Sequence, residues 1–153
     1  MGNLAIKNQG IVLRIGTQAA DPAGDTFTEI KEVTSIGEAG PEAPSIDATA
    51  LTDTARHKLK GIPDYGEVPI SGNRAPTDAG QTALNAAAKS TSDDPYNFEI
   101  EFSDMPSGGS NNTKISFKAL VLSFKTESGD VDGLVSFASS LAITGATTEV
   151  IAA

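Results

Sequence analysis

The sequence contains no cysteine and no tryptophan, and it has a single histidine. Without cysteine, neither disulfides nor thiolate-bound metals can hold the fold together. His57 alone would have to serve any Ser-His-Asp triad, and it lies among Arg56, Lys58 and Lys60, so we interpret it as a surface or packing residue. Aromatic residues make up only 5% of the chain, which disfavours a sugar-binding platform. These absences remove most familiar catalytic and metal chemistries.

Basic residues are also scarce, since 11 Lys and Arg stand against 20 Asp and Glu. The net charge of −9 disfavours binding nucleic acid through its phosphates, which requires clustered Lys and Arg. It is compatible with nucleic acid that passes by without being held, because like charges repel.

The N-terminus shows no secretory signal pattern, and no apolar run approaches the roughly 20 residues of a membrane span. We therefore expect a soluble protein made in the cytoplasm, with one domain over residues 1–153.

Alternation of apolar and polar residues predicts a mainly β fold. The segment 96–102 is the strongest case, with aromatic and aliphatic residues alternating with Asn97, Glu99 and Glu101. Pro69 predicts an edge position or a bulge, and the segment 114–126 changes phase near Leu120. The predicted strands are 10–16, 27–36 (with a bulge), 54–60, 65–73, 96–102, 114–126 and 135–144.

One helix is predicted over Ala75–Lys89. Pro76 lies near its start, and Asp78 with Gln81 three residues later resembles a capping box. Its apolar stripe of small residues would allow close packing on a sheet. The predicted fold is a β-sandwich or partly open barrel with one flanking α-helix.

Two motifs contain residues of the types found in catalytic or metal-binding sites. Glu99 and Glu101 could form the carboxylate pair of a glycoside hydrolase, but a strand face exposed to solvent is the favoured interpretation. Asp130-Val-Asp132-Gly133 resembles the start of a calcium loop without its remaining ligands, which favours an acidic turn. We predict no enzyme, no cofactor and no metal site.

The segment Ile46–Gly72 carries a family resemblance. It contains Asp47-Ala-Thr49, then the turn Gly61-Ile-Pro-Asp64-Tyr-Gly66, then the strand-like Val68–Gly72. In this order the motifs resemble the major tail tube proteins of long-tailed (siphophage-type) bacteriophages, and the similarity runs along essentially the whole chain.

The resemblance implies a β-sandwich with a flanking helix, six copies per ring, and rings stacked into a hollow tube through which DNA reaches the host. It implies a long inter-strand loop, here about residues 37–64, that reaches the adjacent ring. The implied partners are further copies of the chain and the tape measure, tail-tip and tail terminator proteins, with DNA passing unbound. The implied location is the virion tail. Some relatives carry a C-terminal immunoglobulin-like domain, which we do not expect here.

Two sets of site residues follow from this picture. Because an acidic lumen repels DNA phosphates, the lumen-facing candidates are Glu29, Glu67, Glu99 and Glu101. A basic strand face and acidic loops on another copy complement each other, so the inter-subunit or inter-ring candidates are Arg56, Lys58, Lys60, Glu38, Glu42 and Asp47.

Alternatives remain open at this point. The tube of a gene transfer agent or of a type VI secretion system shares the implied fold. A carbohydrate-binding or adhesin-like β-sandwich and a hydrolase using Glu99 and Glu101 are the alternatives from other classes.

Overall fold

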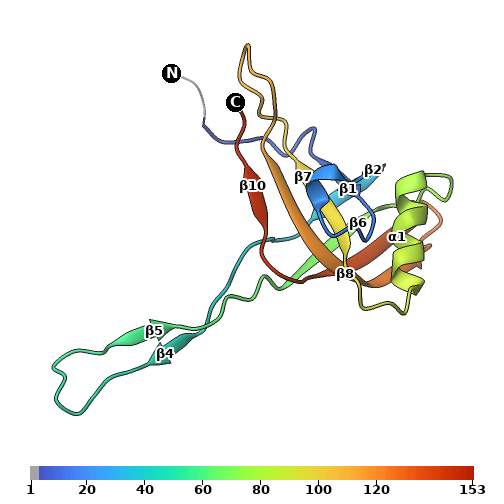
Figure 1. Cartoon of the computed structure of the whole chain (residues 1–153). Coiled ribbons are helices and arrows are strands. Elements are labelled where there is room, and N and C mark those ends of the chain that lie inside the picture. The colour runs from blue at the N-terminus through green and yellow to red at the C-terminus, as the bar shows by residue number, and fades with distance from the viewer. Residues whose placement is uncertain (1–3) are drawn as a thin grey trace.

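The computed structural model describes residues 4–153. Residues 1–3, which belong to the N-terminal stretch without a secretory signal pattern, lie outside the described part. The chain is mainly antiparallel β-sheet with one α-helix, as predicted (Figure 1). The elements are β1 (Val12–Ile15), η1 (Pro22–Gly24), β2 (Thr28–Ile30), β3 (Val33–Ile36), β4 (Ser45–Asp47), β5 (Lys58–Lys60), β6 (Glu67–Asn73), α1 (Ala79–Lys89), β7 (Tyr96–Glu101), β8 (Lys114–Glu127), β9 (Ser136–Ile143) and β10 (Thr148–Val150).

The main sheet has the strand order β2-β1-β7-β8-β9-β6-β3. Its longest strand, β8, belongs to two halves: residues 114–119 pair with β7, and residues 119–127 pair with β9. The register shifts between Val121 and Ser123, which leaves Leu122 53% exposed. The predicted change of phase therefore exists, but it comes after Val121 and not at Leu120. Strand β10, which is absent from the predicted strands, pairs with β8 at residues 114–116.

The predicted single strand 27–36 is two strands that belong to opposite ends of the sheet. β2 pairs with β1, whereas β3 pairs with β6. Between them Glu32 has φ of 64°, a left-handed conformation that breaks an extended strand. The N–H of Asn73 donates to the Glu32 carbonyl at 2.8 Å and fixes this corner. Lys31 and Glu32 thus connect the two ends of the sheet.

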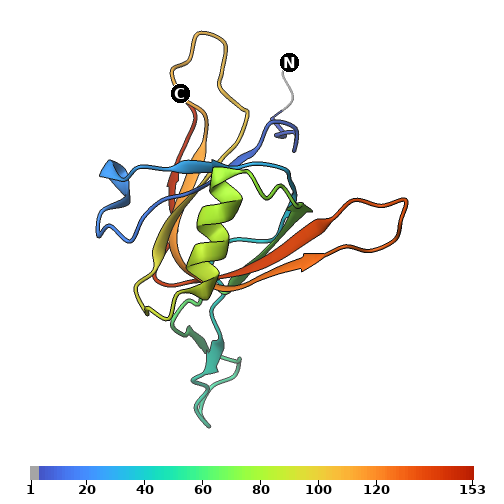
Figure 2. The same cartoon turned by 90° about the vertical axis from the view of Figure 1, so that its right-hand side faces the viewer.

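The core lies between the inner face of this sheet and α1. Alternate residues of β6 and β9 are buried, as are Phe98 of β7 and Phe117 of β8, and Leu84 and Ala87 of α1 close the core from the helix side. α1 lies against β1, β2 and β8 (Figure 2). A Cβ on Gly80 would come within 2.1 Å of the Glu29 carbonyl oxygen, so the first turn of α1 approaches β2 as only glycine allows.

The helix begins four residues later than predicted, at Ala79, because Asp78 is its N-cap and accepts a hydrogen bond from the Gln81 N–H. The side chain of Gln81 does not return to Asp78 as a capping box would. It is fully buried at the corner, donates to the carbonyls of Lys31 and Asn73, and accepts from Ala75 and Arg74. One helical amide therefore joins the two ends of the sheet.

The prediction of an edge position or a bulge at Pro69 was wrong. β6 has β9 on one side and β3 on the other, and Pro69 pairs with Ser140 in regular register. β3 ends at Ile36, and the next residue, Gly37, donates its N–H to the Pro69 carbonyl. A Cβ on Gly37 would meet the proline ring at 2.4 Å. The glycine makes room for the ring where the strand ladder ends, so the missing proline N–H interrupts no regular pairing.

Three projections leave the body. The arm (residues 37–64, with β4 and β5) extends from one end, and the β7–β8 loop lies with the C-terminus at the opposite end in both views (Figures 1 and 2). The β8–β9 hairpin projects from the side of the body in Figure 2. Within residues 4–153 no helix is long and apolar enough to cross a membrane.

Candidate assembly surfaces

The arm is a two-stranded hairpin that pairs with itself. β4 and β5 are antiparallel, with Ser45 opposite Lys60 and Asp47 opposite Lys58. Nearer the body, the N–H of Gly61 donates to the Pro44 carbonyl, and Glu42 bridges to Asp64. No residue from 37 to 64, all of which the structure describes, is buried. Because an isolated hairpin is at best marginally stable in water, contact with another surface would stabilise the arm.

The Asp-x-Thr motif shapes the outer part of the arm. Asp47 accepts a hydrogen bond from the Thr49 N–H, and the hydroxyl of Thr49 accepts from the His57 N–H. The hydrogen bonds from Thr49, and then the Arg56 guanidinium, hold the pKa of Asp47 below its ordinary value. Of the predicted strand 54–60 only Lys58–Lys60 pairs as a strand.

The predicted inter-subunit residues differ in how free they are. Arg56 forms an ion pair with Asp47 of the same arm at 2.9 Å, so these two candidates satisfy each other. Lys58 and Lys60 are exposed, and so are Glu38 and Glu42 at the base of the arm; none of the four has an ion pair within residues 4–153. His57 is exposed, 3.7 Å from Asp53. The unpaired cations and the unpaired carboxylates thus occupy different stretches of one arm.

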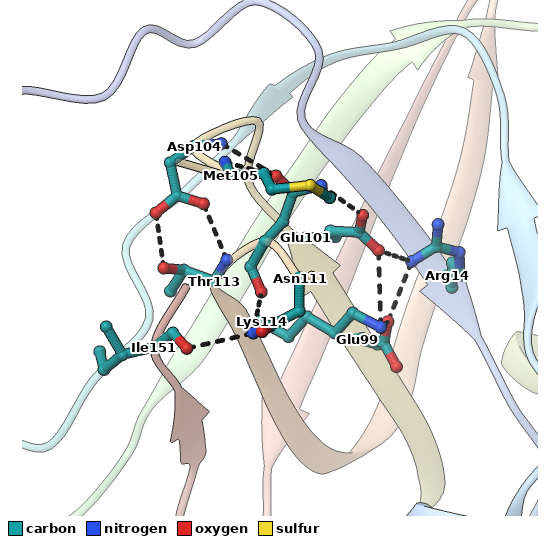
Figure 3. A network of polar contacts seen from close by, with 10 residues as sticks. Arg14, Glu99, Glu101, Asp104, Met105, Asn111, Thr113, Lys114 and Ile151 are labelled. Atoms are coloured by element: carbon teal, nitrogen blue, oxygen red, sulfur yellow. Dashed lines mark hydrogen bonds and ion pairs between the residues drawn. The ribbon is translucent and has the colours of Figure 1, made fainter. Parts of the chain in front are cut away.

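The outer face of β1, β7 and β8 carries a charge network (Figure 3). Arg14 Nη1 donates to Glu99 at 2.9 Å and to Glu101 at 2.8 Å, and Lys114 Nζ lies 3.7 and 3.8 Å from the same two carboxylates. The carboxylate side chains are only 12% and 19% exposed. The face expected to be solvated is thus half-buried and charge-paired. In the sheet a cation lies opposite each carboxylate, Arg14 opposite Glu99 and Lys114 opposite Glu101. Sequence patterns did not indicate the first pair, because Arg14 lies 85 residues from Glu99.

The electrostatics of this network agree with its geometry. The hydrogen bond from the Asn112 amide, followed by Arg14, holds the pKa of Glu101 below its ordinary value. Burial alone would lower the pKa of Arg14, but the hydrogen bond and charge of Glu101 raise it. Two cations balance two carboxylates, so Glu99 and Glu101 present little net negative charge.

The same network fixes the β7–β8 loop. Asn112 donates to Glu101 and accepts, through Oδ1, from the backbone N–H groups of Asp104 and Met105. The Asp104 carboxylate accepts from both the N–H and the hydroxyl of Thr113, which lowers its pKa (Figure 3). Asn111 donates to the Ile151 carbonyl and so connects the loop to the C-terminal segment. The loop is therefore held from the sheet and from the C-terminal segment together.

The remaining lumen-facing candidates, Glu29 and Glu67, take no part in the ion pairs of this network. Glu29 on β2 faces Arg14 across the strands, and Glu67 on β6 lies opposite Ala142; both are exposed and have no ion pair within residues 4–153. At the tip of the β8–β9 hairpin the Gly133 N–H donates to the Asp130 carbonyl in a turn. Among residues 4–153 no group of three or more His, Cys, Asp or Glu is placed to hold a metal ion.

Comparison with known proteins identifies the fold. No protein-family model and no curated protein sequence matches this chain. Solved structures do match over nearly the full length. A chain of the SPP1 tail tube is 17% identical with a TM-score of 0.70, over 96% of this chain and 81% of that one. This chain has the tail tube fold.

Two further matches extend the comparison beyond that phage tube. A chain from the tail of an empty gene transfer agent particle, refined with C6 symmetry, is 15% identical, has a TM-score of 0.67, and is matched over 95% of this chain and 99% of that one. A chain from the PVC extracellular contractile injection system, in its sheath/tube terminator, is 10% identical, has a TM-score of 0.72, and is matched over 98% and 99%. At these identities the tail tube fold is what the chains have in common.

Proposed function

We propose that this protein is the subunit of a tail tube, in which hexameric rings of the chain stack into a hollow tube that delivers DNA to a host cell. The observation that carries the proposal is the end-to-end match with a chain of the SPP1 tail tube, over 96% of this chain at a TM-score of 0.70. In this role the chain is structural and not an enzyme, it resides in the virion tail, and its partners are other copies and the proteins that end the tube. A gene transfer agent tube would use the same subunit contacts.

The exposed arm supports assembly on physical grounds. Leu51 is fully exposed, Ile62 is 88% exposed and Leu59 is 60% exposed, and nothing within residues 4–153 covers them. Burying such side chains against another copy removes apolar area from water, which stabilises the contact by about 25 cal/mol for each Å² buried. A contact between two different surfaces of identical chains closes into a ring where its rotation closes, and otherwise repeats into a filament.

Charge gives the assembly its register. We infer that Lys58 and Lys60 of one copy meet Glu38 and Glu42 of a neighbour, because these four groups lack ion pairs of their own in the described chain. The residues lie on the arm of every copy, so one repeated contact would satisfy them all. Complementary charges of this kind fix register and exclude wrong pairings more than they add affinity.

The charge pattern also bears on the lumen. We propose that some of Glu29, Glu67, Glu99 and Glu101 face it, with Glu29 and Glu67 supplying most of the repulsion, since Arg14 and Lys114 neutralise the other two. DNA would then pass without a binding site. A map of the assembled tube with all four side chains on its outer surface would overturn this assignment.

The test is negative-stain electron microscopy of purified protein over a series of concentrations at neutral pH and moderate salt, with the double variant K58E/K60E beside the wild type. Hollow rods or six-fold rings are expected for the wild type, and loss of rods for the variant. The matched control K89E/K125E reverses two exposed lysines outside the arm and should assemble normally.

Restoring opposite charges tests the pairing itself. The combination of K58E/K60E with E38K/E42K should recover rods. A wild type that stays monomeric over the whole concentration series would contradict the tube function. Normal rods from K58E/K60E would contradict only the proposed charge pairing.

A further inference from the structure

The tip of the β8–β9 hairpin, residues 128–134, lies beyond the last strand pair of the hairpin. That pair joins Glu127 to Ser136, and the hairpin projects from the side of the body (Figure 2). Every residue of the tip is exposed, so no packing within residues 4–153 holds it. One backbone hydrogen bond closes the tip, from the Gly133 N–H to the Asp130 carbonyl at 3.0 Å. A lone bond in an exposed turn opens at little cost in free energy.

This tip contains the one place in the sequence where a glycine follows an Asp or an Asn, Asp132-Gly133. Because glycine has no Cβ, nothing on it obstructs its own backbone nitrogen from approaching the preceding carboxyl group. The Asp132 carboxylate forms no hydrogen bond and no ion pair within residues 4–153. By contrast, the carboxylates of Asp25, Asp47 and Asp104 accept hydrogen bonds from backbone N–H groups, which hold them in place.

We propose that Asp132 is a site of spontaneous isoaspartate formation. Once the turn opens, the Gly133 backbone nitrogen attacks Cγ of the protonated Asp132 carboxyl. A bond forms between that nitrogen and Cγ, and the N–H proton and one carboxyl hydroxyl leave as water, which closes a succinimide ring. Water then opens the ring. Attack at Cγ restores aspartate, whereas attack at the main-chain carbonyl of Asp132 gives isoaspartate. One water is released and one is taken up, so no other reagent is needed.

The product changes the shape of the tip and leaves the fold intact. In isoaspartate the main chain runs through the former side-chain methylene, and a carboxylate is attached directly to Cα. The strand pairs of the hairpin end at Glu127 and Ser136, outside the altered residues. The negative charge is kept, so the net charge of −9 does not change. The reaction is independent of the proposed tube function, because it requires only the exposed tip.

Asp130 is the control within the same tip. It is exposed, and its carboxylate also forms no hydrogen bond and no ion pair within residues 4–153. It precedes Val131, whose branched side chain obstructs the same ring closure. The two aspartates therefore differ chiefly in the residue that follows them.

The experiment stores the folded, full-length protein at neutral pH and physiological temperature for several weeks. A methyltransferase specific for isoaspartate, supplied with labelled S-adenosylmethionine, counts the modified residues, and fragmentation mass spectrometry locates them. Isoaspartate is expected at residue 132 and not at residue 130. No isoaspartate at residue 132, or isoaspartate there only when the chain is unfolded in urea, would overturn the proposal.

Three variants test the ring closure itself. Gly133→Ala should lose the methylation signal, and it should keep the fold because the new Cβ meets only the Asp130 carbonyl oxygen, at 3.4 Å. Asp132→Glu keeps the charge but has one more methylene, which prevents the same ring, so it should lose the signal too. Asp132→Asn should react sooner than the wild type, because it expels ammonia, and each conversion adds one negative charge that isoelectric focusing detects. Equal methylation of the wild type and G133A would overturn the assignment.

Discussion

The side-chain amide of Gln81, on the helix, donates a hydrogen bond of 2.9 Å to the carbonyl of Lys31, at the corner where β2 ends and the chain turns into β3. A second bond of 2.9 Å goes to the Asn73 carbonyl on β6. Since β2 and β3 lie at opposite ends of the strand order, this amide holds together elements that no strand pairing joins directly. The corner is also where Arg74 reaches Gln81 and lies over the Phe124 ring, 5.0 Å from its centroid.

Replacing Gln81 with leucine should destabilise the fold strongly. The substitution removes the partner of the Lys31 and Asn73 carbonyls and of the Ala75 N–H at a part-buried site, at about 1–3 kcal/mol for each group left unsatisfied. We expect a loss of roughly 3–5 kcal/mol in the free energy of unfolding, measured by urea denaturation. Asn85→Ala on the same helix is the control, and it should stay within about 0.5 kcal/mol of the wild type. Equal midpoints for the two variants would show that the amide is dispensable.

Gly80→Ala separates helix propensity from packing. In an isolated helix alanine is favoured over glycine by about 1 kcal/mol. Here the new Cβ would lie 2.1 Å from the Glu29 carbonyl oxygen and 2.6 Å from the Ile30 Cα, so backbone has to move. We expect a net loss of about 2 kcal/mol or more, visible as a lower melting temperature.

Gly24→Ala is the comparison for that variant, since a Cβ there meets nothing within 4 Å. It should be neutral or slightly stabilising, because alanine reduces the freedom of the unfolded chain. If G80A matched G24A, the close approach of α1 to β2 would carry no energetic weight.

These corner residues show where sequence reasoning succeeds and where it stops. Alternation located most strands and local signals located the helix, but its start was predicted at Ala75, four residues before the Asp78 N-cap. The separation of β2 from β3 depends on the left-handed backbone conformation of Glu32. A glutamate in the sequence does not predict that conformation. Gln81 looked like a capping residue, and its real partner Lys31 is 50 residues away.

The candidate surfaces divide in the same way. The long loop at about residues 37–64 was expected only from the family resemblance that the Asp-x-Thr and Gly-x-x-Asp-x-Gly motifs carry, whereas the alternation within it predicted a strand over 54–60 of which only Lys58–Lys60 pairs. The pairing of Glu99 and Glu101 with Arg14 was not predicted, since it depends on β1 lying beside β7. β10 was missed because its three residues are all exposed, and so they lack the alternation that marks a half-buried strand.

Acid should loosen the loop between β1 and β2. Hydrogen bonds from Thr17 and Asn97 outweigh the opposing effect of burial and lower the pKa of Asp25 to about 2 from 3.8. A carboxyl whose pKa is depressed on folding stabilises the native state above its unfolded pKa. That contribution is lost as the pH falls from about 4 to about 2. After allowance for solvent screening it amounts to about 1 kcal/mol.

The Asp25→Asn variant identifies this group. It should be less stable than the wild type at pH 7, and the difference should shrink as the pH falls towards 2, in denaturation curves taken at several pH values. Asp93→Asn, at an exposed position without a hydrogen bond to its side chain in the described chain, is the control and should show no such trend. A pH-independent difference for D25N would assign its effect to packing and not to charge.

Removal of Arg14 should cost much more than removal of Arg56, although both form ion pairs of 2.9 Å. The Glu99 side chain is 12% exposed, whereas Asp47 is 53% exposed and Arg56 is 77% exposed. Arg14→Leu leaves two half-buried carboxylates with Lys114 as their remaining cation, and we expect a loss of about 2 kcal/mol. Arg56→Leu breaks a solvated pair and should leave the free energy of unfolding nearly unchanged. Because the pKa of Glu101 is lowered on folding, the deficit of R14L should be largest near neutral pH and should diminish as the carboxyls protonate. Denaturation curves of both variants at pH 7 and pH 3 measure these losses in the free energy of unfolding. A loss for R14L no larger than that for R56L would mean that the network contributes no more than an exposed ion pair.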